Sequence, residues 1–117
     1  MKKYIWFSAL TIFFCCSILQ AQDPVKVAPN IYKTIFENDR VRVCEVSIKA
    51  GDKIGMHSHP AHLGYALTPA KLQMKDSTGK SQVAELKQGD VVWFEPITHE
   101  AENLGAAAKL IVVELKK

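Results

Sequence analysis

The sequence predicts an all-β domain, either a sandwich or a barrel of short strands. From residue 31 onward, runs rich in valine, isoleucine and aromatic residues alternate with turns of glycine, proline and aspartate. Outside the N-terminal segment, no window of ten or more residues has helical periodicity. The length of 117 residues allows one domain. About nine strands in so short a chain bury enough surface only if two sheets roll face to face.

Residues 1–21 have the pattern of a secretory signal peptide. Lys2 and Lys3 precede an apolar run over residues 4–19, and Ala21 suits a cleavage site. The run is shorter than the ~20 residues that a membrane-spanning helix usually needs. We therefore expect an exported protein, periplasmic or secreted, with an uncleaved membrane anchor or a lipoprotein as the alternatives. Residues 22–37 then form an N-terminal arm and first strand, and residues 38–117 form the barrel domain.

Charge and cysteine content narrow the possible partners. Without the two lysines of the signal segment, 13 of the 15 basic residues remain against 12 acidic ones, a net charge of +1. This balance argues against a nucleic-acid partner and against binding to an anionic membrane surface. Cys44 is then the one remaining cysteine, so no intrachain disulfide can form. Its neighbours Val43 and Val46 favour a buried position in a strand.

The expected strands follow one another with short turns between them. Proline, glycine and aspartate residues mark most of these turns. In the seventh strand, alternation places Val92 and Phe94 on one face and Val91 and Trp93 on the other, and leaves open which pair faces the core. The strands are expected at residues 31–36, 40–49, 54–59, 63–68, 71–75, 82–86, 91–95, 99–103 and 110–115.

Histidines provide the main indication of chemistry. His57 and His59 are two residues apart, so both side chains lie on one face of an extended strand. His99 lies in a second stretch, which also begins with a glycine and passes through an apolar strand. Imidazole is the commonest protein ligand for transition metals and is mostly neutral at pH 7. We expect the fold to bring His99 to His57 and His59.

Two glycine–histidine motifs resemble those of the cupin superfamily of small β-barrels. The first runs from Gly51 through His57 and His59, and the second from Gly89 through His99 to Asn103. The resemblance covers residues 40–115 and implies a cupin-type double-stranded β-helix, or jelly-roll barrel. The sequence departs from the cupin pattern where Leu63 and Gly64 replace the usual glutamate ligand, and where Glu95 replaces a proline.

The expected site is a three-histidine centre for a divalent metal ion: zinc, iron, manganese, nickel or copper. Three protein ligands leave positions open for water or substrate, as in catalytic sites. Without the carboxylate the bound ion keeps a higher net charge, which favours a small anionic ligand.

Three further residues are candidates for supporting roles. On a regular strand, His62 is out of phase with His57 and His59, so we expect an exposed side chain, with a fourth ligand or a proton donor as the alternative. Glu95 is expected as an exposed charge, or else as an acceptor that orients His99. Asn103 is expected as a hydrogen-bonding residue that closes the barrel rather than as a ligand.

Three functions agree with this site. One is a metal-dependent oxygenase, isomerase or lyase that acts on a small metabolite. Another is a non-catalytic module that binds a small ligand with or without metal, and the third is a structural, dimer-forming unit. The sequence leaves open whether the protein is an enzyme. Because a small barrel has strand edges to cover, we also expect a homodimer.

Overall fold

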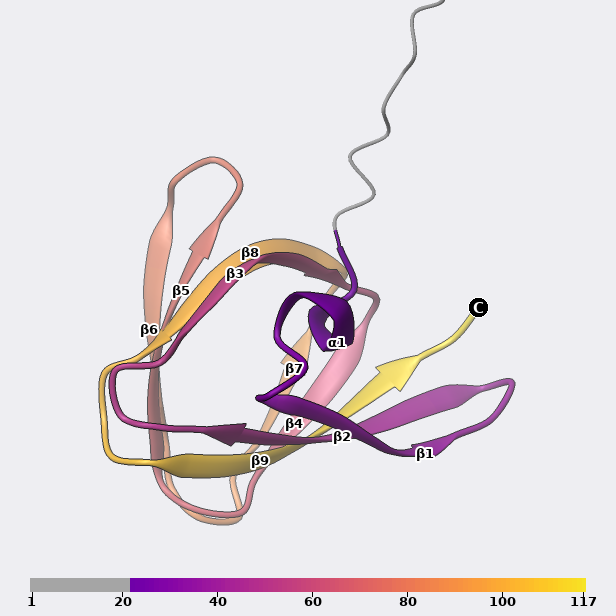
Figure 1. The fold of residues 1–117 in the computed structure, drawn as a ribbon, viewed down its shortest axis with the longest axis horizontal. Coiled ribbons are helices and arrows are strands. Elements are labelled where there is room, and N and C mark those ends of the chain that lie inside the picture. Colours follow the sequence, from indigo (N-terminus) through magenta and orange to yellow (C-terminus); the bar gives the residue numbers. More distant parts are fainter. Residues whose placement is uncertain (1–21) are drawn as a thin grey trace, which may run out of the picture.

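The computed structural model describes residues 22–117, so the expected signal peptide lies outside the described residues. Within this part of the chain, no helix is long and apolar enough to cross a membrane. Two antiparallel sheets curve around a common interior (Figure 1). One sheet has the strand order β1-β2-β9-β4-β7 and the other β3-β8-β5-β6. The strands are β1 (Tyr32–Glu37), β2 (Val41–Ile48), β3 (Lys53–His59), β4 (His62–Ala66), β5 (Ala70–Asp76), β6 (Ser81–Leu86), β7 (Val91–Phe94), β8 (Ile97–Asn103) and β9 (Ala108–Leu115).

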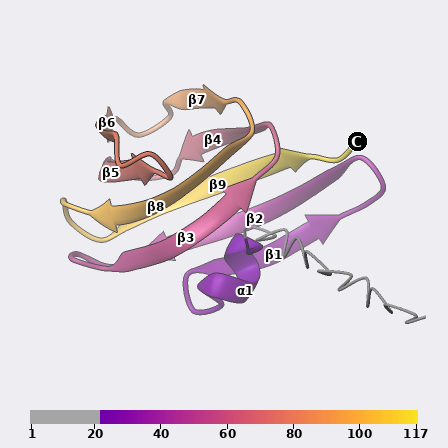
Figure 2. The same cartoon turned by 90° about the horizontal axis from the view of Figure 1, so that it is seen from above.

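All nine expected strands are present, and the all-β prediction is confirmed. The expected N-terminal arm also contains one helical turn, α1 (Pro24–Val27). Asp23 caps this turn by accepting a hydrogen bond from the backbone N–H of Val25 at 2.9 Å, and Pro24 suits the first turn because its missing N–H has no partner there anyway. The turn packs against β1 and β3 (Figure 2).

Alternation along the strands determines the core. Cys44 and Val46 on β2 and Leu110 and Val112 on β9 point inward and are buried, which confirms the expected position of Cys44. On β7, Val92 and Phe94 line the interior, whereas Val91 and Trp93 are more than half exposed. The structure therefore resolves the choice that the sequence left open.

The register of the sheets places the two histidine motifs side by side. His57 on β3 lies directly opposite His99 on β8. A β-bulge between Ile54 and His57 adds one residue to β3 relative to β8. On a regular strand, Ile54 and His57 would point to opposite faces, because they are three residues apart and strand side chains alternate with a period of two. The bulge absorbs one residue of this separation, so Ile54 stays in the core and His57 also points inward.

A second row of side chains crosses the inner face of the five-stranded sheet. Successive cross-strand pairs join Phe94 on β7, His62 on β4, Glu114 on β9 and Arg42 on β2. This row faces the histidines of β3 across the interior, and the side chain of His59 reaches Glu114. The site is therefore built between the two sheets rather than on one of them.

Candidate metal centre

The structure brings His57, His59 and His99 together in a buried cluster. Their side chains offer ligand atoms that all lie within 4.8 Å of one another. The ring centroids of His57 and His99 are 4.7 Å apart, and those of His57 and His59 are 4.8 Å apart. The three residues are 0%, 5% and 4% exposed, respectively, in the order His57, His59 and His99. A cluster of this composition could hold a divalent metal ion.

Hydrogen bonds fix which nitrogen is available on three of the four imidazoles. Nδ1 of His57 donates to the carbonyl of Gly55 at 2.7 Å, and Nδ1 of His62 donates to the carbonyl of Pro60 at 2.8 Å. Nδ1 of His59 donates to Oε2 of Glu114 at 2.8 Å. Because carbonyls and carboxylates only accept, each Nδ1 carries the hydrogen. In its neutral form each of these rings therefore presents the lone pair of Nε2, as metal ligands do.

Unsatisfied nitrogens provide a test of whether this cluster fits a metal. Among residues 22–117, two buried side-chain atoms have no hydrogen-bond partner, namely Nε2 of His57 and Nδ1 of His99. An unsatisfied buried polar group costs about 1–3 kcal/mol, so native proteins rarely leave such a group without a partner. Both atoms belong to the histidine cluster. A cation bound by imidazole nitrogens would account for their burial, so the residues fit a metal ion.

Burial also keeps the imidazoles of His57, His62 and His99 neutral, which is the form that binds metals. Burial, with smaller effects from neighbouring imidazoles, lowers the pKa of His57 to about 4 and that of His99 to about 3. The pKa of His62 is lowered as well, first by burial and then by His59. Free imidazole lone pairs are thus present at neutral and mildly acidic pH.

The same pKa shifts predict that acid destabilises the metal-free protein. Between pH ~6.5 and ~4, the unfolded chain protonates His57 and His99 while the folded protein does not, so the free energy of unfolding falls as pH falls. Each histidine contributes about 1.4 kcal/mol per pH unit in this window. Urea unfolding with a chelator present at pH 7 and pH 5 measures the effect. The variant His57→Gln should show a shallower dependence, and equal stability of the native chain at both pH values would contradict the prediction.

Glu114 is the main candidate site residue that the sequence interpretation missed. Its buried carboxylate accepts the Nδ1–H of His59 and pairs with Arg42, whose Nε lies 2.7 Å from Oε1. Arg42 in turn pairs with Asp23 beside α1. Burial alone would raise the pKa of Glu114, but the hydrogen bonds from His59 and Arg42 outweigh it and hold this pKa below its usual value. The carboxylate is therefore charged and fixes the orientation of His59.

His62 differs from its sequence-based expectation. The expected exposed side chain is wrong, because His62 is only 3% exposed. Pro60 and the step from β3 to β4 move His62 into the other sheet, so its phase relative to His57 and His59 no longer decides where it points. The ring stacks on Phe94 with centroids 4.8 Å apart, and its centroid lies 4.3 Å from that of His59. His62 therefore lines the interior beside the three-histidine cluster.

Glu95, Leu63 and Gly64 contribute no side chain to the histidine cluster. Glu95 is exposed and accepts a hydrogen bond from Nε1 of Trp93, so the structure does not bring it to His99. Leu63 lies half-buried on β4, away from the interior, while Gly64 lines the interior pocket. A Cβ at Gly64 would lie 3.4 Å from Val92. Gly64, at a position where the cupin motif has its glutamate, therefore provides no side chain to the site.

Asn103 has the barrel-closing position that the sequence favours. Its Nδ2 lies within 3.2 Å of the carbonyl oxygens of Ile48, Lys49 and Ala106, and its Oδ1 accepts from the N–H of Gly105. The side chain thus ties the turn after β2 to the turn before β9.

We expect Asn103→Ala to destabilise the protein by about 2–3 kcal/mol, since buried backbone carbonyls lose their donor. Metal content per folded chain should not change, because Asn103 lies outside the histidine cluster. Urea unfolding and metal analysis of the folded fraction check both points. Glu102→Ala, on the opposite face of β8, is the matched control. Loss of metal from a folded Asn103→Ala protein would contradict this purely structural role.

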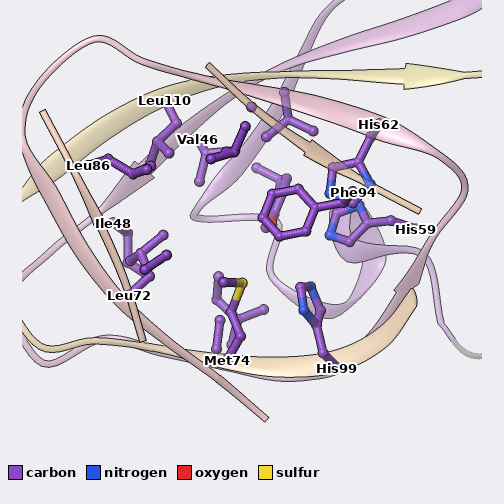
Figure 3. Close-up of a pocket in the computed structure, with 17 residues that line it drawn as sticks. Val46, Ile48, His59, His62, Leu72, Met74, Leu86, Phe94, His99 and Leu110 are labelled. Carbon is purple, nitrogen blue, oxygen red and sulfur yellow. The ribbon is translucent and has the colours of Figure 1, made fainter. Parts of the chain in front are cut away.

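A pocket adjoins the histidines inside the barrel. Its cavity volume is about 70 Å³, and His59, His62 and His99 lie at one end of it. Figure 3 shows Phe94 and Met74 between these imidazoles and an aliphatic region. That region is formed by side chains from both sheets, including Val46, Ile48, Leu72, Leu86 and Leu110. The cluster is thus open to a molecule inside the barrel.

Solved structures with the same fold provide the comparison. No protein-family model and no curated protein matches the sequence. A cupin domain from Bordetella pertussis superposes with a TM-score of 0.68 at 23% identity, covering 74% of this chain and 93% of that one. KdgF from Halomonas gives 0.57 at 20% identity, covering 83% and 86%. A variant of oxalate decarboxylase from Bacillus subtilis gives 0.56 at 21% identity, covering 73% of this chain but 24% of the other.

These structural likenesses confirm the resemblance that the two glycine–histidine motifs indicate. The identities are too low to transfer an activity, and the fold alone does not choose among the chemistries that it supports. The β-jelly roll, the pairing of β3 with β8 and the solved neighbours agree on one architecture. The chain has the cupin fold.

Proposed function

We propose that the protein binds one divalent metal ion through His57, His59 and His99 and a small molecule in the adjoining pocket. The single observation that carries this proposal is the pair of buried, unpartnered nitrogens on His57 and His99. A cluster that served only as core would be expected to satisfy these atoms or to replace the rings with hydrocarbon. Their retention favours a ligand that completes the site.

The protein's own groups would prepare this site in three ways. The carbonyl of Gly55 and the carboxylate of Glu114 hold His57 and His59 in the tautomer that exposes Nε2. Glu114 also places one negative charge next to His59, which partly offsets the charge of a bound cation. Apolar side chains line most of the pocket, and surroundings of low polarity strengthen electrostatic interactions inside it. A divalent ion held there would supply Lewis acidity and open coordination positions.

The proposal also includes catalysis and export. Open positions beside an apolar pocket favour a metal-dependent oxygenase, isomerase or lyase over a structural unit. A non-catalytic small-molecule binder uses the same geometry, and oxygen uptake with a panel of small acids separates the two. The pattern of residues 1–21 supports a periplasmic or secreted location.

Titration of the metal-free protein with Co²⁺ tests the proposed centre. Nitrogen ligands and open positions should give visible absorption bands that saturate at about one equivalent. Addition of Zn²⁺ should remove these bands by competition. A cobalt spectrum identical to that of the aquated ion, with the protein folded by circular dichroism, would contradict the proposal.

A further inference from the structure

The pocket beside the histidines has two chemically distinct ends. Figure 3 shows the imidazoles of His59, His62 and His99 on one side and aliphatic side chains such as Leu86 and Leu110 on the other. Met74 and Phe94 lie between the two ends. A ligand that fills this space therefore places a polar head at the histidines and a hydrocarbon part towards Leu86.

Among the described residues, no charged side chain lines the pocket. The lining includes the three imidazoles and Tyr32, and every other side chain in it is apolar. Glu114 and Arg42 are paired with each other behind His59 and are not part of the lining. A second charged or hydroxyl group on the ligand would thus enter the hydrocarbon end without a partner. Such unpaired burial costs several kcal/mol for a polar group and more for an ion.

The histidine end of the pocket, in contrast, favours a charged group on the ligand. A divalent ion held by three neutral imidazoles keeps its double positive charge, so it favours an anionic head group. The ionised Glu114 offsets one of these charges through His59. One further negative charge on the ligand completes the balance, and a carboxylate provides it.

Cavity size limits the hydrocarbon part. The volume of about 70 Å³ is roughly half that of an apolar protein cavity of about 150 Å³ that takes up benzene. A tail of about three carbon atoms suits this space, since benzene has six. Met74 can adjust to its shape, because a methionine side chain is unbranched and flexible.

We propose that the pocket takes a small monocarboxylate with a short hydrocarbon tail, rather than a dicarboxylate or a polyhydroxylated acid. The inference rests on the proposed metal centre, because the metal would receive the carboxylate. It goes beyond the metal centre because it also assigns a hydrocarbon tail to the other end of the ligand. The evidence for this tail is the apolar lining of the pocket.

Co²⁺-loaded protein tests this assignment with butanoate and succinate, which have four carbon atoms each and differ by one carboxylate. Butanoate should shift the visible cobalt bands and bind at least about 10-fold more tightly than succinate or oxalate, since 1.4 kcal/mol corresponds to tenfold. Equal or tighter binding of succinate or oxalate would overturn the inference. If cobalt itself does not bind, the proposed metal centre fails instead, so the two failures are distinguishable.

Variants on β6 locate the hydrocarbon end. Leu86→Phe fills that end and should weaken butanoate binding at least about 10-fold while acetate and Co²⁺ still bind. Val83→Phe is the matched control, because Val83 lies on the same strand and is 48% exposed. Ala84→Leu, a smaller addition within the lining, serves if Leu86→Phe does not fold. Unchanged butanoate binding in a folded filled variant would contradict the proposed orientation.

Discussion

Replacing His57 with alanine should lower the bound metal from about one ion per chain to almost none. His57 is fully buried at the centre of the cluster, opposite His99 and next to His59. Its loss leaves two imidazoles, too few for the three protein ligands that open metal sites usually provide. Metal analysis after reconstitution with Zn²⁺ and removal of free ions measures the effect.

Met56→Ala is the matched control for this variant. Met56 precedes His57 on β3 and is 42% exposed, so its side chain does not contribute to the cluster. This variant should keep its metal. His57→Gln tests the same ligand with a side chain closer in size, in case the alanine variant does not fold. Full metal occupancy in a folded His57 variant would show that other residues form the site.

Replacing Glu114 should have the largest effect on stability. Glu114→Ala leaves the half-buried guanidinium of Arg42 without this partner and His59 without an acceptor. Breaking a buried pair in this way costs about 3–5 kcal/mol. Urea unfolding of the metal-free protein measures the change. Glu45→Ala removes a peripheral pair with Lys109 and should change stability by no more than about 1 kcal/mol.

Glu114→Gln separates the positioning of His59 from folding. The glutamine amide keeps the size and one acceptor oxygen but loses the charge that faces His59 and Arg42. Loss of such a ligand-orienting group weakens metal binding by about 10–100-fold. Competition titration with a chromophoric chelator gives the affinity of the folded variant. Native affinity in Glu114→Gln, together with native stability in Glu114→Ala, would show that this carboxylate has neither role.

Local pattern was sufficient to predict most of the fold. Valine-rich runs and glycine, proline and aspartate turns marked all nine strands, because turn chemistry and strand propensity act within a few residues. The spacing of His57 and His59 also predicted a common face, since alternation is local. What alternation missed is the β-bulge before His57. Gly55, an isolated glycine inside a strand, was the signal that could have predicted it.

Long-range pairing explains the part of the site that the sequence did not reveal. Glu114 is 55 residues from His59, and only the pairing of β9 with β4 and β2 brings it there. A signal existed, because Glu114 continues the inward series of Leu110 and Val112. An acid in phase with core residues needs a buried partner. His62 was misjudged for a related reason, since its orientation depends on which sheet receives the chain after Pro60.

Metal content of the native protein tests the central claim most directly. The protein should be purified without a metal-affinity tag, freed of loosely bound ions and analysed for transition metals before and after reconstitution. We expect close to one divalent ion per chain after reconstitution, with the metal present before it identifying the native ion. A folded protein that holds almost no metal even after reconstitution would contradict the proposed three-histidine centre.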